Sequence, residues 1–409
     1  MRYDFAVVGA NGMQGKIVAR DLLESGYSVL LCATDDLGLE RLLEQERAGF
    51  AVIDLKTKVE RVRRIVKNSG AQVIVNCSCD DFNLKVTKLA LDLGVHYIDL
   101  GSEEDMTREQ SALHNDFRAK NVLAISGIGS TPGINNIMLR YVKDSFDTVD
   151  TVHLGFAWDS NMPHFVPPFS IDAIQYEFTE PAKILENGSY VEKSPLEPTK
   201  LDYYYKTIGR QHTCYTKHIE HHTFYDFLKD KGVKDIVVFS SFPSHSYTAI
   251  RKMIELGFLN KEPIEVNGVM IRPLDFTIEV LRRIPMPEGY TEKENIWLKV
   301  YGTKDGQRKV EEMDCIAGTM PGWEDATCNV DTGFPASILA QMIIKGEIAE
   351  RGFFSPEFVV DPGLFFERLG DKKLYVYRNG KKINGDTKSA ARTRTLSAIQ
   401  PIRTLQPQS

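Results

Sequence analysis

The first 150 residues alternate short apolar runs with longer amphipathic stretches. The apolar runs predict strands at residues 4–8, 28–33, 50–54, 71–77, 95–99 and 121–126. Amphipathic stretches between them predict helices, notably at 14–25, 82–93 and 103–119. Strands that are apolar on both faces are typical of parallel sheets covered by helices. The alternation therefore predicts an α/β fold of the Rossmann type, a doubly wound parallel sheet that binds ligands beyond the carboxyl ends of its strands.

The pattern changes near residue 149. Strand-like runs at 151–158, 235–242 and 296–301 are separated by helical stretches at 245–256 and 273–283, and a further helix is predicted at 335–347. We expect a first domain at 1–148, which a late segment at 332–370 joins, and a substrate and dimerisation domain at 149–331. The second domain is predicted to be α+β, with an open mixed or antiparallel sheet. Residues 371–409 are poor in apolar positions and predict a flexible basic tail.

A glycine-rich turn follows the first predicted strand, in FAVVGANGMQG at 5–15. Gly9 suits the tight turn, Gly12 lets the backbone approach a pyrophosphate, and Gly15 allows close helix packing. Asp35 ends the second strand, where a carboxylate binds ribose hydroxyls and repels a 2′-phosphate, which favours NAD over NADP. The alternative is a plain strand–helix turn with a helix-capping aspartate. The residues expected to bind the cofactor are Gly9, Asn11, Gly12, Met13, Gln14, Gly15, Asp35, Asp36, Asp54, Cys77, Ser78 and Gly101.

Composition narrows the class of protein. With 42% apolar residues, 26% charged residues and a net charge of -6, the chain is typical of globular proteins and has no general attraction to nucleic acid or anionic membranes. It has no apolar run of about 18 residues and no signal-peptide pattern, so we expect a cytoplasmic enzyme without membrane or nucleic-acid partners. A cluster at 212–222 (His212, Cys214, His218, His221, His222) matches no metal-ligand spacing, and no metal is predicted.

Several longer motifs occur in a characteristic order over most of residues 1–370. After the glycine turn come GIGSTPGINNIM at 127–138, EFTEPAKILENG at 177–188, FPSH at 242–245, ELGF at 255–258, VNGVMIRPLDF at 266–276, TGFPASILAQMIIKGEI at 332–348 and FFSPEFVVDPGLFFERL at 353–369. In these motifs the chain resembles the saccharopine dehydrogenase superfamily, and more closely its lysine 6-dehydrogenase-like branch. It departs from the patterns of that superfamily at Thr131, Ser241 and Ser244.

The resemblance implies an NAD-dependent oxidoreductase that acts on a small amino-acid or amine substrate. The long second-domain sheet with an exposed edge predicts a homodimer. In the lysine 6-dehydrogenase reading, a CH–NH2 group is oxidised and the product is 2-aminoadipate 6-semialdehyde. The alternatives are a saccharopine-type or carboxynorspermidine-type enzyme that acts on a secondary amine, and an NAD-binding protein without catalytic activity.

The catalytic residues expected from these readings are His245, as proton acceptor, and Asp81. Asp80 is expected to bind the substrate ammonium, and the other predicted substrate residues are Thr131, Gly133, Asn135 and Trp158. Each has a structural alternative: a helix start for His245, Asp80, Asp81 and Asn135, and a core position for Trp158.

Overall fold

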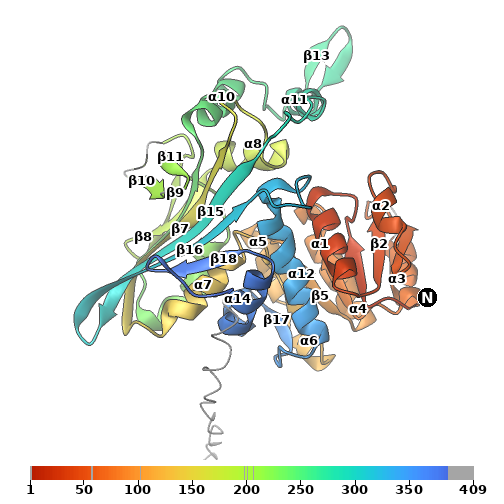
Figure 1. Ribbon diagram of the computed structural model, residues 1–409, viewed down its shortest axis with the longest axis horizontal. Coiled ribbons are helices and arrows are strands. Elements are labelled where there is room, and N and C mark those ends of the chain that lie inside the picture. Colours follow the sequence, from red (N-terminus) through yellow and green to blue (C-terminus); the bar gives the residue numbers. More distant parts are fainter. Residues whose placement is uncertain are drawn as a thin grey trace, which may run out of the picture.

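The fold is built on two β-sheets that lie side by side (Figure 1). The computed structural model describes residues 2–56, 59–101, 103–197, 199, 201–205 and 207–385. Among these residues, no helix has the length and apolar character that crossing a lipid bilayer requires.

The first sheet has seven parallel strands in the order β17-β6-β5-β4-β1-β2-β3. Phe5 and Val7 point to one core and Ala6 and Val8 to another, as the alternation of side chains along a strand requires. The strands are β1 (Phe5–Val8), β2 (Val29–Ala33), β3 (Ala48–Val52), β4 (Val73–Asn76), β5 (His96–Asp99), β6 (Leu123–Ile125) and β17 (Gly352–Phe354).

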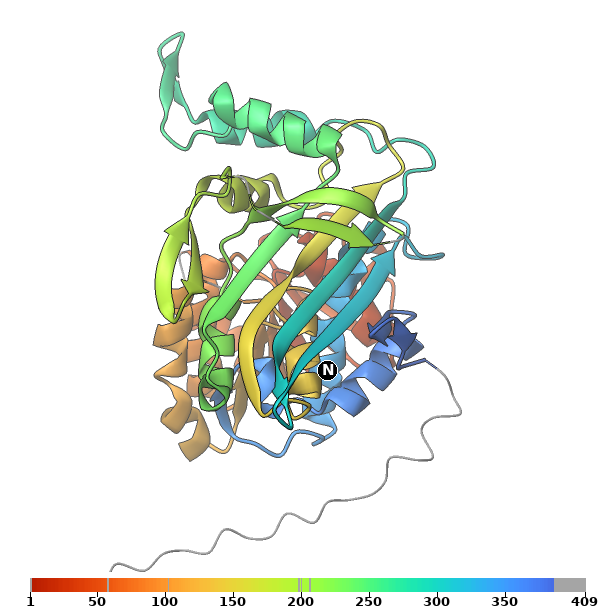
Figure 2. The same cartoon turned by 90° about the vertical axis from the view of Figure 1, so that its left-hand side faces the viewer.

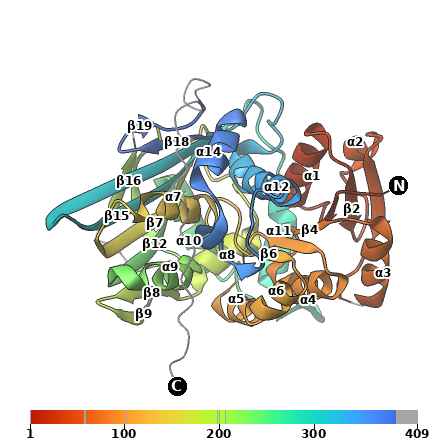
Figure 3. The same cartoon turned by 90° about the horizontal axis from the view of Figure 1, so that it is seen from below.

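Helices cover both faces of this sheet. The helices of the first part are α1 (Met13–Glu24), α2 (Glu40–Leu43), α3 (Val59–Ser69), α4 (Asn83–Leu93), α5 (Glu104–Ser111), α6 (His114–Ala119) and α7 (Ile134–Lys143). Those of the late part are α12 (Val330–Ile344), α13 (Pro356–Val359) and α14 (Pro362–Asp371). Helices α1 and α12 lie side by side on one face, and α3, α4 and α6 cover the other (Figure 3). The predicted α/β class is therefore confirmed.

The second sheet is mixed and has ten strands. Its main order is β10-β11-β12-β7-β15-β16-β18-β19, with β8 paired to β12 and to β9. Strand β12 runs parallel to β7, and the other pairs are antiparallel. The strands are β7 (Thr148–Ser160), β8 (Ala182–Glu186), β9 (Ser189–Lys193), β10 (Asp202–Tyr205), β11 (Gly209–Tyr215), β12 (Asp235–Ser241), β15 (Glu292–Lys304), β16 (Gln307–Gly318), β18 (Tyr375–Arg378) and β19 (Lys381–Lys382).

Four helices and a small hairpin complete this part of the chain. They are α8 (Ile171–Thr179), α9 (Glu220–Leu228), α10 (Ser244–Glu255) and α11 (Pro273–Arg282), with hairpin strands β13 (Ile264–Val266) and β14 (Val269–Ile271). Figure 2 shows the long strands of the second sheet and the hairpin projecting beyond them. The two sheets share one continuous apolar core, which includes Val7 of β1, Met138 of α7 and Leu298 of β15.

Three sequence predictions need correction. Residues 103–119 form two helices, α5 and α6, instead of one. Helix α12 begins at Val330, before the predicted start at residue 335, and Pro335 lies inside it. The predicted tail from residue 371 is wrong for its first part, because β18 pairs with β16 and Arg378 forms an ion pair with the buried Glu311. Residues 386–409 lie outside the described residues.

Candidate active site

The turn between β1 and α1 is a backbone cradle that only glycine fits. Gly9 has a φ of 78°, and a Cβ there would lie 2.7 Å from the carbonyl oxygen of Cys77. A Cβ on Gly15 would overlap the carbonyl oxygen of Gly9, so this glycine lets α1 pack against the strand end. Gly12 is the residue before α1, and its N–H lies 3.0 Å from the carbonyl oxygen of Gly9.

Asp35 lies just beyond β2, on the exposed side of this turn. Its Oδ1 accepts hydrogen bonds from Nδ2 of Asn11 at 3.0 Å and from the backbone N–H of Leu37 at 3.1 Å. These bonds, that of Asn11 first, hold the pKa of Asp35 below its usual value, so the carboxylate is ionised at neutral pH. Asp36 is exposed next to it, and Asp54 accepts a bond from the N–H of Lys56 at 2.8 Å after β3.

Asp99, at the end of β5, organises the neighbouring loops. One carboxyl oxygen accepts bonds from the N–H groups of Gly101 at 2.9 Å and Gly127 at 3.1 Å and from the hydroxyl of Ser126 at 2.7 Å. The other accepts bonds from Tyr97 and Gln110, each at 2.8 Å. A Cβ on Gly101 would lie 2.9 Å from Pro132, so the loops after β5 and β6 touch. Our sequence analysis missed this role of Asp99.

The loop after β6 carries several predicted substrate residues. Asn135 is buried and donates to Oγ1 of Thr131 at 3.0 Å, while its own Oδ1 has no hydrogen-bond partner. Gly133 has a φ of 138°, and a Cβ there would overlap the carbonyl oxygen of Gly129. The hydroxyl of Thr332 bonds to that of Ser130 at 3.1 Å, which ties the start of α12 to this loop.

These features fit a dinucleotide cofactor. A turn with glycine at positions 9 and 12 leads into the N-terminus of a 12-residue helix, where free N–H groups favour a pyrophosphate. Beyond the strand ends lie Cys77, Ser78 and Gly101, in the region where a nicotinamide ring binds in such sheets. Gln14 at the start of α1 bonds to Asn329 at 3.2 Å, which links the cradle to the chain before α12.

Four buried carboxyl groups gather where one end of the second sheet meets this edge of the first. They are Glu177 of α8, Glu292 and Glu294 of β15, and Asp331 of α12, all at most 9% exposed. We call them the carboxyl cluster. Sγ of Cys328 lies 2.9 Å from Oε2 of Glu292 and 3.4 Å from Oε2 of Glu294. Oε2 of Glu177 and Oδ2 of Asp331 are buried without a hydrogen-bond partner.

The cluster is electrostatically costly in its ionised form. Burial raises the pKa of Glu177 to about 7. Burial, together with the neighbouring carboxyls, also raises the pKa values of Glu294 and Asp331. No lysine or arginine in the described part of the chain forms an ion pair with these residues or offsets their shifts. A cation that entered the cluster would therefore gain strong electrostatic attraction.

Trp158 belongs to the same region. It lies opposite Glu294 in the register of β7 and β15, so the two side chains share one face of the second sheet. It is fully buried, which agrees with a core position, yet its Nε1–H has no hydrogen-bond acceptor. The indole N–H is therefore available to donate a hydrogen bond to a bound molecule beside the carboxyl cluster.

The predicted catalytic residues lie on other elements than the carboxyl cluster. His245 is the second residue of α10; its Nδ1 lies 3.0 Å from the hydroxyl of Ser246, and it acts electrostatically on Asp159. Asp159 follows Trp158 along β7, so it points to the opposite face of the sheet. Asp80 and Asp81 lie in an exposed turn after β4, and Oδ1 of Asp80 accepts from the N–H of Asp81 at 3.1 Å. Helix α10 packs against α8, which carries Glu177, and Asp80 acts electrostatically on Tyr176, the residue before Glu177. The roles predicted for these residues stay predictions.

The histidine-rich segment holds the two parts of the molecule together. Nε2 of His221 and Nζ of Lys183 contact Oε2 of Glu104 in α5 at 3.1 Å and 2.8 Å. Burial alone would raise the pKa of Glu104, but the hydrogen bonds from Lys183 and His221 outweigh this effect and lower the pKa to about 2. His212 pairs with Asp202, and His218 with Glu220. No metal-binding group of histidine, cysteine or carboxylate residues is found among the described residues.

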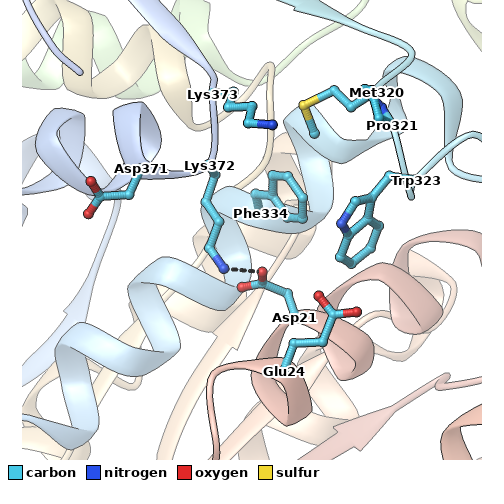
Figure 4. A pocket seen from close by; sticks show the side chains of 9 residues that line it. All are labelled: Asp21, Glu24, Met320, Pro321, Trp323, Phe334, Asp371, Lys372 and Lys373. Atoms are coloured by element: carbon cyan, nitrogen blue, oxygen red, sulfur yellow. Dashed lines mark hydrogen bonds and ion pairs between the residues drawn. The ribbon is translucent and has the colours of Figure 1, made fainter. Parts of the chain in front are cut away.

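A surface cavity lies apart from this site (Figure 4). It has a volume of about 170 Å³ and is lined by Asp21 and Glu24 of α1, Trp323 and Phe334, and Lys372 after α14. Asp21 forms an ion pair with Lys372 across it. No residue predicted for the cofactor or substrate lines it, so we do not assign the activity to it.

The two parts of the chain match two known domains. Residues 5–125 match the saccharopine dehydrogenase NADP binding domain, and residues 129–374 match the saccharopine dehydrogenase C-terminal domain. The chain belongs to the saccharopine dehydrogenase family. The fold agrees with apo saccharopine dehydrogenase (L-Glu forming) from Saccharomyces cerevisiae, with a TM-score of 0.72 at 12% identity over 93% of this chain and 100% of that one.

Two curated relatives cover nearly the whole chain. Carboxyaminopropylagmatine dehydrogenase of Synechocystis sp. is 23% identical over 90% of this chain and 95% of its own length. Carboxynorspermidine synthase of Vibrio cholerae is 21% identical over 89% and 91%. The saccharopine dehydrogenase family makes this chain an oxidoreductase with a nicotinamide cofactor. Its assignment to the lysine 6-dehydrogenase-like branch stays a prediction.

Proposed function

We propose that the chain is a nicotinamide-dependent oxidoreductase that makes or breaks a secondary amine in a carboxylated polyamine. This function corresponds to the carboxynorspermidine-type alternative of the sequence analysis. It is supported by the two curated relatives, which are named carboxyaminopropylagmatine dehydrogenase and carboxynorspermidine synthase. It takes the place of the lysine 6-dehydrogenase reading as the preferred function.

The carboxyl cluster is the observation that carries the proposal. Each isolated buried carboxylate costs several kcal/mol in free energy unless a cation pairs with it. A polyamine carries several ammonium groups at the spacing of short alkyl chains, so one substrate can pair with more than one carboxylate. Glu177, Glu294 and Asp331 come from three separate elements and offer such a set.

The residues of the chain have two tasks in this reaction. A bound nicotinamide supplies or accepts the hydride. Glu294 and Glu177 bind ammonium groups and so orient the reacting carbon. Oδ2 of Asp331, buried without a partner beside the loop after β6, accepts the proton that the amine loses or returns it in the opposite direction. His245 is kept as the other candidate for this proton transfer.

We propose NAD as the preferred cofactor. The ionised carboxylate of Asp35 lies where a ribose binds, and it would repel the 2′-phosphate of NADP. The matching family domain is described as NADP binding, and the proposed preference for NAD rests on Asp35 alone.

The test is a steady-state assay with NAD and NADP against lysine, saccharopine, ornithine and carboxylated polyamines. We expect kcat/KM for a carboxylated polyamine to exceed that for lysine by about 100-fold or more, because lysine would lose at least one ion pair in a desolvated site. A preference for lysine would restore the lysine 6-dehydrogenase reading. Cofactor binding without turnover of any substrate would favour a non-catalytic NAD-binding protein.

A further inference from the structure

Residues 256–286 form an arm that projects from the second sheet. It contains the chain after α10, the hairpin β13–β14 and the helix α11, and it extends beyond the body of the molecule (Figures 1 and 2). Of the 17 large apolar residues that are exposed in the described part of the chain, ten lie in this short segment. They are Leu256, Phe258, Ile264, Val266, Val269, Met270, Phe276, Val280, Ile284 and Met286.

The hairpin at the tip of the arm lacks a core of its own. Strands β13 and β14 pair only with each other, and Ile264, Val266, Val269 and Met270 are 42% to 63% exposed. Ile264, Val266 and Val269 share one face of the two-stranded ribbon, and Met270 lies on the other face opposite Glu265. An isolated two-stranded hairpin is marginally stable in water and needs a further layer against its apolar side chains. The sequence of the arm therefore suits a covered position better than an exposed one.

The exposed area matches that of a stable interface. The ten side chains are 42% to 70% exposed, so together they expose on the order of 1,000 Å² of apolar surface. The largest apolar patch on a monomeric protein is typically about 300–600 Å². A stable dimer buries roughly 800 Å² on each partner.

The charges on the arm indicate what covers it. Between residues 256 and 286 there are four basic residues (Lys261, Arg272, Arg282, Arg283) and four acidic residues (Glu262, Glu265, Asp275, Glu279). Arg272 pairs with Asp275, and Arg282 with Glu279, within the arm itself. An apolar surface with no net charge, on which positive and negative side chains are interspersed, can bind the same surface of a second copy without net electrostatic repulsion. Nucleic acid and anionic membranes select basic surfaces instead.

We propose that two copies of this chain associate through their arms, one arm against the other about a two-fold axis. The other exposed large apolar residues (Met13, Leu37, Val52, Tyr190, Tyr204, Val310, Phe358) belong to separate elements, so the second arm is the largest apolar surface that a partner copy offers.

The test is sedimentation velocity of the full chain over a wide range of concentrations. We expect a dimer for the natural sequence, and a dissociation constant at least about 100-fold higher for the double variant Val269→Glu, Met270→Glu. The control Val310→Glu adds one negative charge at an exposed position of β16, against two in the arm variant, and should leave the dimer unchanged. A natural chain that stays monomeric, or a dimer that the arm variant does not weaken, would overturn the proposal.

A second measurement does not depend on the variants. Hydrogen exchange of the natural chain should show amide protection at residues 264–271 that rises with protein concentration, in parallel with dimer formation. Exchange in the hairpin that stays fast while the dimer forms would place the interface elsewhere. This measurement decides the question even where the double variant fails to fold.

Discussion

At the scale of single residues, the carboxyl cluster shows how burial alone changes the chemistry of a common side chain. Asp331 lies in the first turn of α12, where a sequence predicts only favourable interaction with the helix dipole. In the structure it is 2% exposed and faces Glu294, so desolvation and like charge together raise its pKa. A residue that looks like a helix cap becomes a candidate proton acceptor.

We expect Asp331→Asn and Glu294→Gln each to lower kcat/KM for a carboxylated polyamine by about 100-fold or more. The amides keep the shape but can neither pair with an ammonium group nor accept its proton. Steady-state kinetics and circular dichroism measure the activity and the fold.

The matched control is Asp314→Asn. Asp314 is half-buried, and burial raises its pKa to about 6, but it bonds to Asn295 on the opposite face of the second sheet. This change should affect stability more than kcat/KM. If His245→Ala abolishes turnover while Asp331→Asn does not, the proton acceptor is His245.

Asp35 is the residue that we expect to set cofactor choice. Asp35→Ser should weaken NAD binding and improve the use of NADP, because the same carboxylate binds the ribose and repels a 2′-phosphate. The ratio of kcat/KM for the two cofactors measures this change. Glu44→Gln, at an exposed acidic position just after α2, is the control. An unchanged ratio in Asp35→Ser would mean that the ribose binds away from β2.

At the scale of elements, distant parts of the chain complete both sheets. Strand β17 adds a seventh strand to the first sheet beside β6, and β18 pairs with β16 of the second. Arg378 of β18 donates two hydrogen bonds to Glu311, at 2.8 Å and 2.6 Å, and this fixes the strand to the sheet. The side chain of Glu311 is only 3% exposed, so the pair is largely removed from water.

We expect Arg378→Gln to reduce the free energy of unfolding by about 2–3 kcal/mol, because it leaves a buried carboxylate without its main cation. Urea denaturation measures this loss. Lys381→Gln, at an exposed position of β19, should change it by less than about 0.5 kcal/mol. Equal effects of the two substitutions would mean that β18 contributes little to the second sheet.

At the scale of the whole molecule, stability should depend on pH in two opposite ways. Glu104 and Glu311 have pKa values of about 2, because hydrogen bonds to cationic side chains favour their ionised forms. Their contribution to stability is complete above their unfolded pKa of about 4.3 and is lost as the pH falls toward 2. Burial raises the pKa values of Glu177 and Glu357 to about 7, so their contribution is complete below about pH 4.3 and is lost as the pH rises through 7.

We therefore expect the thermal midpoint of the ligand-free protein to be highest near about pH 5 and to fall toward both pH 3 and pH 8. Differential scanning calorimetry across this range measures it. Glu177→Gln should flatten the decrease above pH 5, and Glu104→Gln the decrease below it. A midpoint that is constant from about pH 5 to pH 8 would contradict the raised pKa values in the carboxyl cluster.

The sequence by itself determined the first sheet and its cofactor edge. Apolar runs and the glycines at 9, 12 and 15 report local burial and local backbone geometry, and these depend on neighbours close in sequence. The same patterns predicted that the second sheet would be mixed or antiparallel. They could not predict that β12 runs parallel to β7, or that residues 375–382 extend this sheet, because such pairings join segments far apart in the chain.

The carboxyl cluster was decided only by the tertiary structure. Glu292 and Glu294 alternate with Lys293 and Asn295 in a pattern typical of an exposed strand end, and Asp331 looks like a helix cap. Glu177 is the first residue of the EFTEPA motif, and this motif was the one feature of the sequence that could have indicated a functional role for a member of the cluster. The high cost of these buried charges, and with it their ability to bind a cation, arises only when the two sheets pack together and exclude water.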